Sequence, residues 1–297
     1  MSSWPFELSD CALGAYLGFA LGDALGATVE FMTPAEIHRQ YGTHQNIIGA
    51  GWLKLPRGSV TDDTTMSLAL GQAIVEHAGW DMRSVADAFV SWLRARPIDV
   101  GNTCRRGIQR YIADGSLAGW PNEGDAGNGA LMRNLPVALA TRSDDARFER
   151  WTLEQCRFTH NHPLSDAATL AFGRIVHSLL RGQDVDAQRA IARSLVEAHP
   201  VFEFEPYPGR AGGYVVETVQ TVLYHFFAES DFEACLIAVV NRGDDADTNG
   251  ALLGMLAGAR CGARALPERW LKVLDSAVRT RIREQTAALL AIGGRDS

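Results

Sequence analysis

Two short stretches of this 297-residue chain combine adjacent carboxylates with threonine hydroxyls. Residues 59–66 read SVTDDTTM, and residues 241–250 read NRGDDADTNG. Each stretch comes directly before an apolar segment with helical spacing, so the acids lie at expected helix starts. Asp and Thr are favoured N-cap residues, and acids suit the positive end of a helix dipole. For a single acid, helix capping is therefore the preferred interpretation.

The direction of the acidic side chains argues against capping alone. Asp62 shares a helix face with Met66 and Leu70, and Asp247 shares one with Gly254. Both faces are expected to be buried, where a carboxylate is costly unless a cation accompanies it. Carboxylate and hydroxyl oxygens favour Mg²⁺ or Mn²⁺ over zinc or copper. The number of carboxylates favours two ions that share ligands over a single ion.

Composition limits the classes of protein to consider. The chain is 46% hydrophobic and 21% charged, which is typical of a soluble globular protein. Its net charge of −7, without a long basic run, predicts no nucleic-acid partner. Five scattered cysteines without a C-x-x-C pair favour a reducing compartment. The N-terminus lacks signal-peptide features, and the apolar stretch 11–22 is too short to span a bilayer. We therefore expect a cytoplasmic protein without an integral membrane segment.

Helical periodicity recurs along the chain, and strand signals are nearly absent. No linker or shift in composition divides the sequence, so we predict one all-α domain over residues 1–297. Residues 41–60 carry no clear pattern. The spacing predicts helices over residues 10–27, 62–79, 81–94, 102–113, 129–140, 144–158, 163–181, 184–198, 214–228, 231–241, 247–262 and 268–292.

Two of these helices carry glycine at every fourth position. Glycine costs about 1 kcal/mol relative to alanine inside a helix, so a repeated stripe indicates that a neighbouring backbone must come very close. Such stripes pair helices in membranes, but Asp23 and the short apolar length favour a tightly packed soluble interior. We expect both helices to be central. The stripes consist of Gly14, Gly18, Gly22 and Gly26, and of Gly250, Gly254 and Gly258.

Four motifs, in order, resemble those of the ADP-ribosylglycohydrolase family. They are GDALGATVEF (22–31), VTDDTTM (60–66), GNGALMRNLPVAL (127–139) and NRGDDADTNGALLGMLAGA (241–259). The segment RPIDVGNTCRRGI (96–108) and the chain length are most similar to the bacterial members that remove ADP-ribose from an arginine of the nitrogenase iron protein. The resemblance covers most of the chain.

The resemblance implies a dinuclear centre that binds two Mn²⁺ or Mg²⁺ ions. Glu30 would approach the metals or gate the site, and the alternative is a surface acid after the first helix. Asp244 is matched less securely, so we expect it outside the ligand set or facing solvent. The implied ligands are Thr61, Asp62, Asp63, Asp245, Asp247 and Thr248.

By the same resemblance, Asp99 contacts the substrate ribose and transfers protons, while Asn102 orients it. A turn carboxylate and a helix N-cap are the alternatives for these two residues. The remaining implied substrate-binding residues are Gly127, Asn128, Gly129, Met132, His160 and Tyr214.

Each of these substrate-binding positions has an ordinary structural alternative. Backbone amides of a Gly-rich loop at a helix start can bind phosphate, although most such loops are only turns. His160 would lie by the pyrophosphate or ribose, whereas a metal pair with His162 is disfavoured by the oxygen-rich site elsewhere. We expect His162 to be structural. Tyr214 would stack near the adenosine, and the alternative is a core aromatic.

The resemblance implies metal-dependent hydrolysis of the bond between ribose and an arginine guanidinium nitrogen. The implied substrate is dinitrogenase reductase, the nitrogenase iron protein. PII-type signalling proteins are implied regulators that would recruit the enzyme peripherally to a membrane. The alternatives are another ADP-ribosyl linkage or protein, a two-metal phosphohydrolase, and a non-catalytic ADP-ribose-binding protein.

Overall fold

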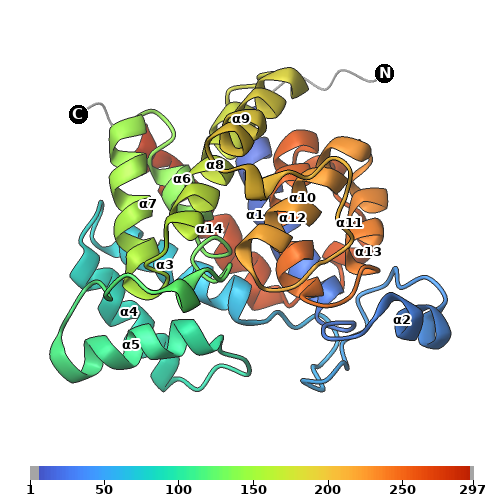
Figure 1. The fold of residues 1–297 in the computed structure, drawn as a ribbon, viewed down its shortest axis with the longest axis horizontal. Helices are drawn as coiled ribbons and strands as arrows, with labels where there is room; N and C mark the ends of the chain where they lie inside the picture. The colour runs from blue at the N-terminus through green and yellow to red at the C-terminus, as the bar shows by residue number, and fades with distance from the viewer. Residues whose placement is uncertain (1–6, 295–297) are drawn as a thin grey trace.

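A computed structural model describes residues 7–294 of this chain, and these residues form an all-helical fold (Figure 1). Within that range there are two isolated β-bridges and no β-strand, which confirms the all-α prediction. None of the helices described is both long and apolar enough to cross a membrane. The helices are α1 (Leu8–Gly26), α2 (Pro34–Tyr41), α3 (Asp62–Glu76), α4 (Met82–Arg94), α5 (Asn102–Asp114), η1 (Glu123–Asp125), α6 (Leu135–Ala140), α7 (Asp145–Thr159), α8 (Pro163–Leu180), α9 (Val185–Ala198), η2 (Pro200–Phe202), α10 (Val215–Ala228), α11 (Phe232–Val240), α12 (Ala246–Cys261), η3 (Ala263–Ala265), α13 (Glu268–Leu271) and α14 (Ser276–Gly293).

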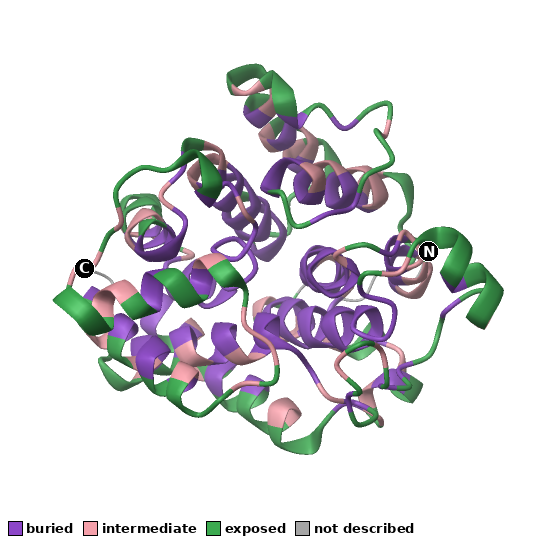
Figure 2. Ribbon diagram, turned by 60° about the horizontal axis from the view of Figure 1, so that its bottom comes forward, coloured by how far each residue is buried: buried purple, intermediate pink, exposed green. Residues whose placement is uncertain are grey.

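The two glycine-striped helices, α1 and α12, pack against each other, and most of their residues are buried. Figure 2 shows that the buried residues gather in the interior of the molecule. A Cβ atom added to Gly22 would lie 1.9 Å from the carbonyl oxygen of Gly250, and one on Gly18 would lie 2.2 Å from that of Gly254. No side chain fits between backbones this close, so only glycine allows the contact. The prediction of close packing is confirmed, and the structure adds that each stripe is the partner of the other.

We expect Gly22→Ala to lower the free energy of unfolding by about 3 kcal/mol, because the new methyl group would force two buried backbones apart. Chemical denaturation measures this loss. The matched control is Gly79→Ala, since a Cβ at Gly79 meets nothing within 4 Å, and its effect should stay within about 0.5 kcal/mol. A Gly22→Ala variant as stable as the control would contradict this account of the packing.

The predicted helix over residues 129–140 is wrong in its first half. Residues 129–133 form turns, and α6 begins only at Leu135. Pro136 provides the physical reason, because it has no amide hydrogen to donate to the carbonyl four residues earlier but is tolerated in a first helical turn. Gly127 and Gly129 therefore lie before or within turns and not at a helix start. The argument for phosphate binding by amides at a helix start does not apply to them.

The predicted helix over residues 268–292 is also wrong, because α13 and α14 are separate. Asp275 caps α14 by accepting hydrogen bonds from the backbone amides of Ala277 (2.8 Å) and Val278 (3.0 Å). α2 was not predicted from the sequence, although reciprocal capping between Thr33 and Glu36 marks its start. The other ten predicted helices are present, with ends that differ by at most three residues.

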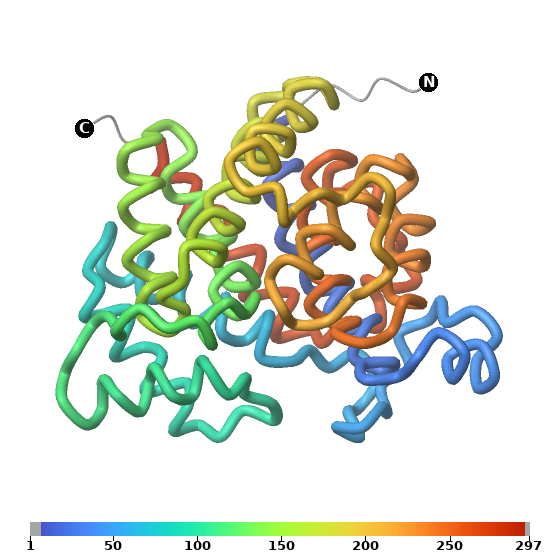
Figure 3. Tube along the Cα trace, viewed as in Figure 1, coloured from blue at the N-terminus to red at the C-terminus, as the bar shows by residue number. Residues whose placement is uncertain are grey.

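The segment between α1 and α3 leaves the helical interior and returns to it (Figure 3). It carries α2 and a loop that closes on itself through a bridge between Ala50 and Leu55. The amide of Phe31 donates to the carbonyl of Asp244 at 2.7 Å, and the amide of Asp244 donates back to Met32 at 2.9 Å. This pairing places the residues after α1 beside the start of α12.

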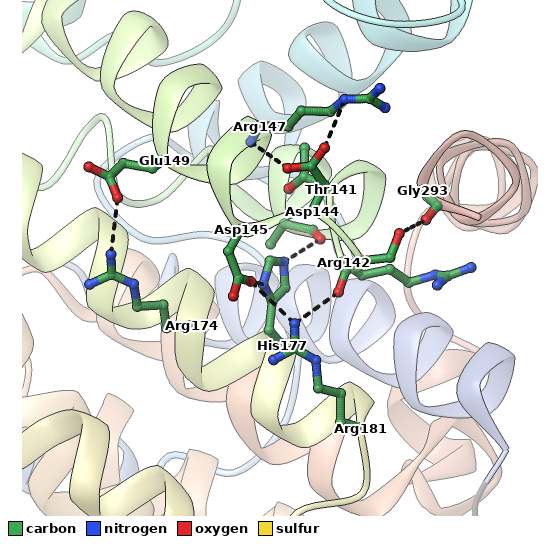
Figure 4. Close-up of polar contacts among 12 residues, drawn as sticks. Thr141, Arg142, Asp144, Asp145, Arg147, Glu149, Arg174, His177, Arg181 and Gly293 are labelled. Atoms are coloured by element: carbon green, nitrogen blue, oxygen red, sulfur yellow. Dashed lines mark hydrogen bonds and ion pairs between the residues drawn. The ribbon is translucent and has the colours of Figure 1, made fainter. Parts of the chain in front are cut away.

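A polar network joins α6, α7 and α8 to the end of α14 (Figure 4). His177 in α8 is 2% exposed, and its Nε2 lies 2.8 Å from a carbonyl oxygen of α6. Arg181 donates to the carbonyl of Arg142 at 3.2 Å, and Ser143 donates to that of Gly293. These contacts fix α6, which follows directly after the Gly-rich turns.

Candidate metal centre and substrate pocket

The two acid–threonine clusters meet in space. The hydroxyl of Thr248, in the first turn of α12, donates to Oδ2 of Asp63, in the first turn of α3, at 3.2 Å. Asp62, Asp63 and Asp247 are all at most 5% exposed. The prediction that Asp62 and Asp247 lie on the buried faces of their helices is confirmed.

Capping does not account for the carboxylates. Thr61 is the N-cap of α3, and its hydroxyl accepts from the amide of Asp63. Asp245 occupies the N-cap position of α12 but makes no side-chain cap bond. Oδ1 of Asp63 is buried and has no hydrogen-bond partner. An unpaired buried carboxylate oxygen among oxygen donors fits a hard divalent cation.

Glu30 belongs to the same acidic group. One carboxylate oxygen from each of Glu30, Asp245 and Asp247 lies within 4.8 Å of the other two, a spacing that could hold a metal ion. Burial, and then neighbouring charges, raises the pKa of Glu30 to about 8 and that of Asp62 to about 7. The same causes raise the pKa of Asp247 well above its ordinary value. The acids are therefore adapted to a bound positive charge.

These pKa shifts predict that the metal-free protein loses stability as the pH rises from 6.5 to 8. The folded state holds protons on Asp62 and Glu30 that the unfolded chain releases at ordinary carboxyl pKa values. Their stabilising contribution is complete below about pH 4 and is lost as the pH passes 7 to 8. His177 and His225, whose pKa values burial lowers to about 4, act in the opposite sense but only below their ordinary pKa of 6.5.

Thermal unfolding of EDTA-treated protein at pH 6.5 and 8.0 measures this effect. We expect Tm to fall by several degrees between the two values, and added Mn²⁺ to raise Tm more at pH 8.0. A metal-free Tm that is higher at pH 8.0 than at pH 6.5 would contradict the prediction.

The carboxylates line a cavity of about 400 Å³, within the usual range for small-molecule sites. Glu30 and Asp244 lie on its wall, and Asp244 is exposed. The cavity brings together twelve of the fourteen predicted site residues, namely Asp62, Asp63, Asp99, Asn102, Gly127, Asn128, Gly129, Met132, His160, Asp245, Asp247 and Thr248.

Thr61 and Tyr214 lie outside the lining of this cavity. Thr61 is 1% exposed, and its hydroxyl lies 3.3 Å from Oδ2 of Asp63. The backbone of Tyr214 forms a β-bridge with Gly127 at the cavity edge, while its side chain is 43% exposed. The alternative of a core aromatic is therefore wrong for Tyr214, and its contact with substrate stays a prediction.

Asp99 lies half-buried in the loop between α4 and α5, where it accepts from the amide of Val100 at 2.7 Å. The next amide, of Gly101, donates to Oδ2 of Asp62 at 3.0 Å, which ties this loop to the acidic group. Burial raises the pKa of Asp99. Gly101, not Asn102, occupies the N-cap of α5, so the capping alternative for Asn102 is wrong.

His160 lines the same cavity. It is 2% exposed, its Nδ1 lies 2.8 Å from the hydroxyl of Thr159, and burial holds its pKa well below the ordinary value, so the ring is neutral. A Cβ on Gly129 would lie 2.8 Å from the His160 ring, which requires glycine there. His162 instead caps α8 by accepting from the amide of Leu164, as expected for a structural histidine.

Two buried charged residues support the site through hydrogen bonds to its neighbours. Neither was predicted from the sequence to have this role. Asp23, at the end of α1, accepts from the amides of Thr61 (2.9 Å) and Thr64 (3.1 Å) and thereby fixes the start of α3. Arg133 is fully buried and donates to the hydroxyl of Thr159 at 2.8 Å, next to His160. The available signal for Asp23 was an acid inside a glycine-striped apolar helix, which must find buried partners.

Comparisons with known proteins identify similar proteins that match nearly the whole chain. The "ADP-ribosyl-[dinitrogen reductase] glycohydrolase" of Rhodospirillum rubrum is 54% identical over 290 residues, which cover 98% of this chain and 99% of the relative. The "ADP-ribosylarginine hydrolase Tri1" of Pseudomonas putida (strain GB-1) is 30% identical and covers 90% of this chain and 75% of the relative.

A solved structure, described as an "ADP-ribosylglycohydrolase-related protein complex", matches with a TM-score of 0.87 and 33% identity. The match covers 97% of this chain and 99% of that one. The sequence profile described as "ADP-ribosylglycohydrolase" matches residues 6–296. The chain therefore belongs to the ADP-ribosylglycohydrolase family.

Proposed function

We propose that this protein hydrolyses the N-glycosidic bond between ADP-ribose and an arginine side chain, and that dinitrogenase reductase is its protein substrate. The observation that carries this proposal is the 54% identity, over nearly both full lengths, to the R. rubrum glycohydrolase named for that substrate. The P. putida relative is named for the ADP-ribosylarginine linkage itself. Acids from both acid–threonine clusters of the family motif line the cavity.

Two divalent ions, Mn²⁺ or Mg²⁺, would supply ligation of the ribose hydroxyls and a water of lowered pKa when bound. The unpaired Oδ1 of Asp63 and the acidic group at Glu30 support this donor set. Asp23 would keep the first cluster in place through its bonds to the start of α3. The residues proposed to hold the ions are Thr61, Asp62, Asp63, Asp245, Asp247 and Thr248.

The remaining lining residues would bind and orient ADP-ribose. The carboxyl of Asp99 lines the same cavity as the acidic group, where it would transfer a proton to or from the reacting ribose. Asn102 would orient the ribose. The neutral His160 would offer a hydrogen bond without adding charge. Gly127, Asn128, Gly129 and Met132 would contact ribose or pyrophosphate, and Tyr214 would contact the adenosine.

Mass spectrometry tests the proposal after arginine-ADP-ribosylated dinitrogenase reductase is incubated with the purified protein, with and without Mn²⁺. We expect dinitrogenase reductase to lose the mass of ADP-ribose, with free ADP-ribose as the small product. Release of AMP or phosphate would instead support a phosphohydrolase. Modified protein that stays unchanged with excess Mn²⁺ would overturn the assignment. Control by PII-type proteins, with peripheral recruitment to a membrane, stays a prediction.

A further inference from the structure

Two exposed aromatic side chains stand on the wall of the substrate cavity. Phe31 is 63% exposed and Trp52 is 51% exposed, and both line the cavity. Their ring centroids are 5.2 Å apart with the planes tilted by 51°. Large aromatic side chains gain stability from burial, so an adjacent pair left exposed at a binding cavity indicates contact with a ligand.

The surrounding structure holds the Phe31 backbone in a strained conformation and holds the indole ring of Trp52 by a hydrogen bond. Phe31 has a φ of 62°, a left-handed conformation that is a true outlier for a bulky residue and costs about 1–3 kcal/mol. Its amide is held by the carbonyl of Asp244 at 2.7 Å. The indole Nε1 of Trp52 donates to Oε2 of Glu30 at 2.6 Å. The Trp52 ring is therefore held against the acidic group, and the Phe31 backbone is held so that its ring lies beside that of Trp52.

The charge of the cavity selects a cationic ligand. Among the described residues that line it there is no Lys or Arg, whereas seven carboxyl groups are present. The lining therefore offers carboxyl groups and no cationic side chain that would repel a further cation, which favours a cationic ligand over an anionic one. The carboxyl groups are those of Glu30, Asp62, Asp63, Asp99, Asp244, Asp245 and Asp247.

Resting on the proposed function, we propose that Phe31 and Trp52 form the subsite for the guanidinium group of the target arginine, with Glu30 holding the indole of Trp52 in place. A guanidinium is a planar, weakly hydrated cation that stacks on aromatic faces. Phe31, Trp52 and Asp99 line the same cavity, so this subsite shares the cavity with the carboxyl proposed to transfer the proton. The leaving group would thus lie between the aromatic pair and Asp99.

Three substitutions separate aromatic stacking from apolar bulk and from the bond to Glu30. Phe31→Leu and Trp52→Leu keep apolar volume but remove the aromatic face. Trp52→Phe keeps an aromatic face but, like Trp52→Leu, loses the hydrogen bond to Glu30. The measurements, both with Mn²⁺ present, are kcat/KM for ADP-ribosylarginine and the Kd for ADP-ribose, which has no guanidinium.

We expect each leucine variant to lower kcat/KM about tenfold, mainly through KM, while the Kd for ADP-ribose stays at the parental value. Trp52→Phe should keep most of the parental kcat/KM. The subsite would be overturned by leucine variants with parental kcat/KM, by an equal loss of ADP-ribose affinity, or by Trp52→Phe being as slow as Trp52→Leu. A parental protein that fails to hydrolyse ADP-ribosylarginine would overturn the proposed function, and this subsite with it.

Discussion

Asp99→Asn should lower kcat for release of ADP-ribose from ADP-ribosylarginine by about 10²- to 10⁴-fold, the usual contribution of a positioned acid or base. Asparagine has nearly the same shape and can still accept from the amide of Val100, but it cannot take up or give a proton. The fold and the content of bound Mn²⁺ should therefore be unchanged. Single-turnover kinetics with saturating enzyme measure the chemical step directly.

The matched control for this prediction is Asp114→Asn. Asp114 is an exposed acid at the end of α5 that bonds only to nearby Ser116, so its variant should react at the parental rate. If Asp99→Asn also released ADP-ribose at the parental rate, Asp99 would be a turn carboxylate without a catalytic role.

Asp247→Asn should remove activity by more than about 10³-fold through loss of Mn²⁺, and yet make the metal-free protein more stable. Asp247 is buried near Glu30 and Asp63, which together with burial raise its pKa. A neutral amide of the same shape removes that unfavourable charge, for an expected gain of about 1 kcal/mol or more at pH 8. Calorimetric titration with Mn²⁺ and urea denaturation in EDTA measure the two effects.

The sign of the stability change separates a metal ligand from a helix cap. If the Asp247 carboxylate served only to cap the start of α12, its substitution would lower the free energy of unfolding by about 1 kcal/mol. Asp244→Asn is the control, because this neighbouring acid is exposed, and it should retain both Mn²⁺ binding and metal-free stability. An Asp247→Asn variant that is less stable without metal, and still binds Mn²⁺, would restore the capping interpretation.

The all-helical fold could be predicted because the pattern of apolar residues is local. The errors also had local signals, since Pro136 excludes a helix through residues 129–140 and Asp275 marks a new helix start. The pairing of α1 with α12 was only half visible. Each glycine stripe predicts a close neighbour, but nothing in either stripe says that Gly22 meets Gly250.

The acidic group could be predicted in the same way, because the direction of Asp62 and Asp247 follows from helix geometry. Asp99 could not be found without the family resemblance, since its importance arises from a loop that returns to α3. The role proposed for Trp52 could not be predicted from the sequence either. It lies in a stretch without periodicity, and its contact with Glu30 depends on how that stretch folds back over the end of α1.

The joining of α1 to α12 has a consequence for how the protein is made. α1 leaves the ribosome before α12, and its glycine face finds no partner until α12 follows. The second set of proposed metal ligands, Asp245, Asp247 and Thr248, emerges at the same late moment. A nascent or prematurely terminated chain that lacks α12 therefore has neither the packed α1–α12 pair nor the second set of proposed ligands, and we expect it not to remove ADP-ribose.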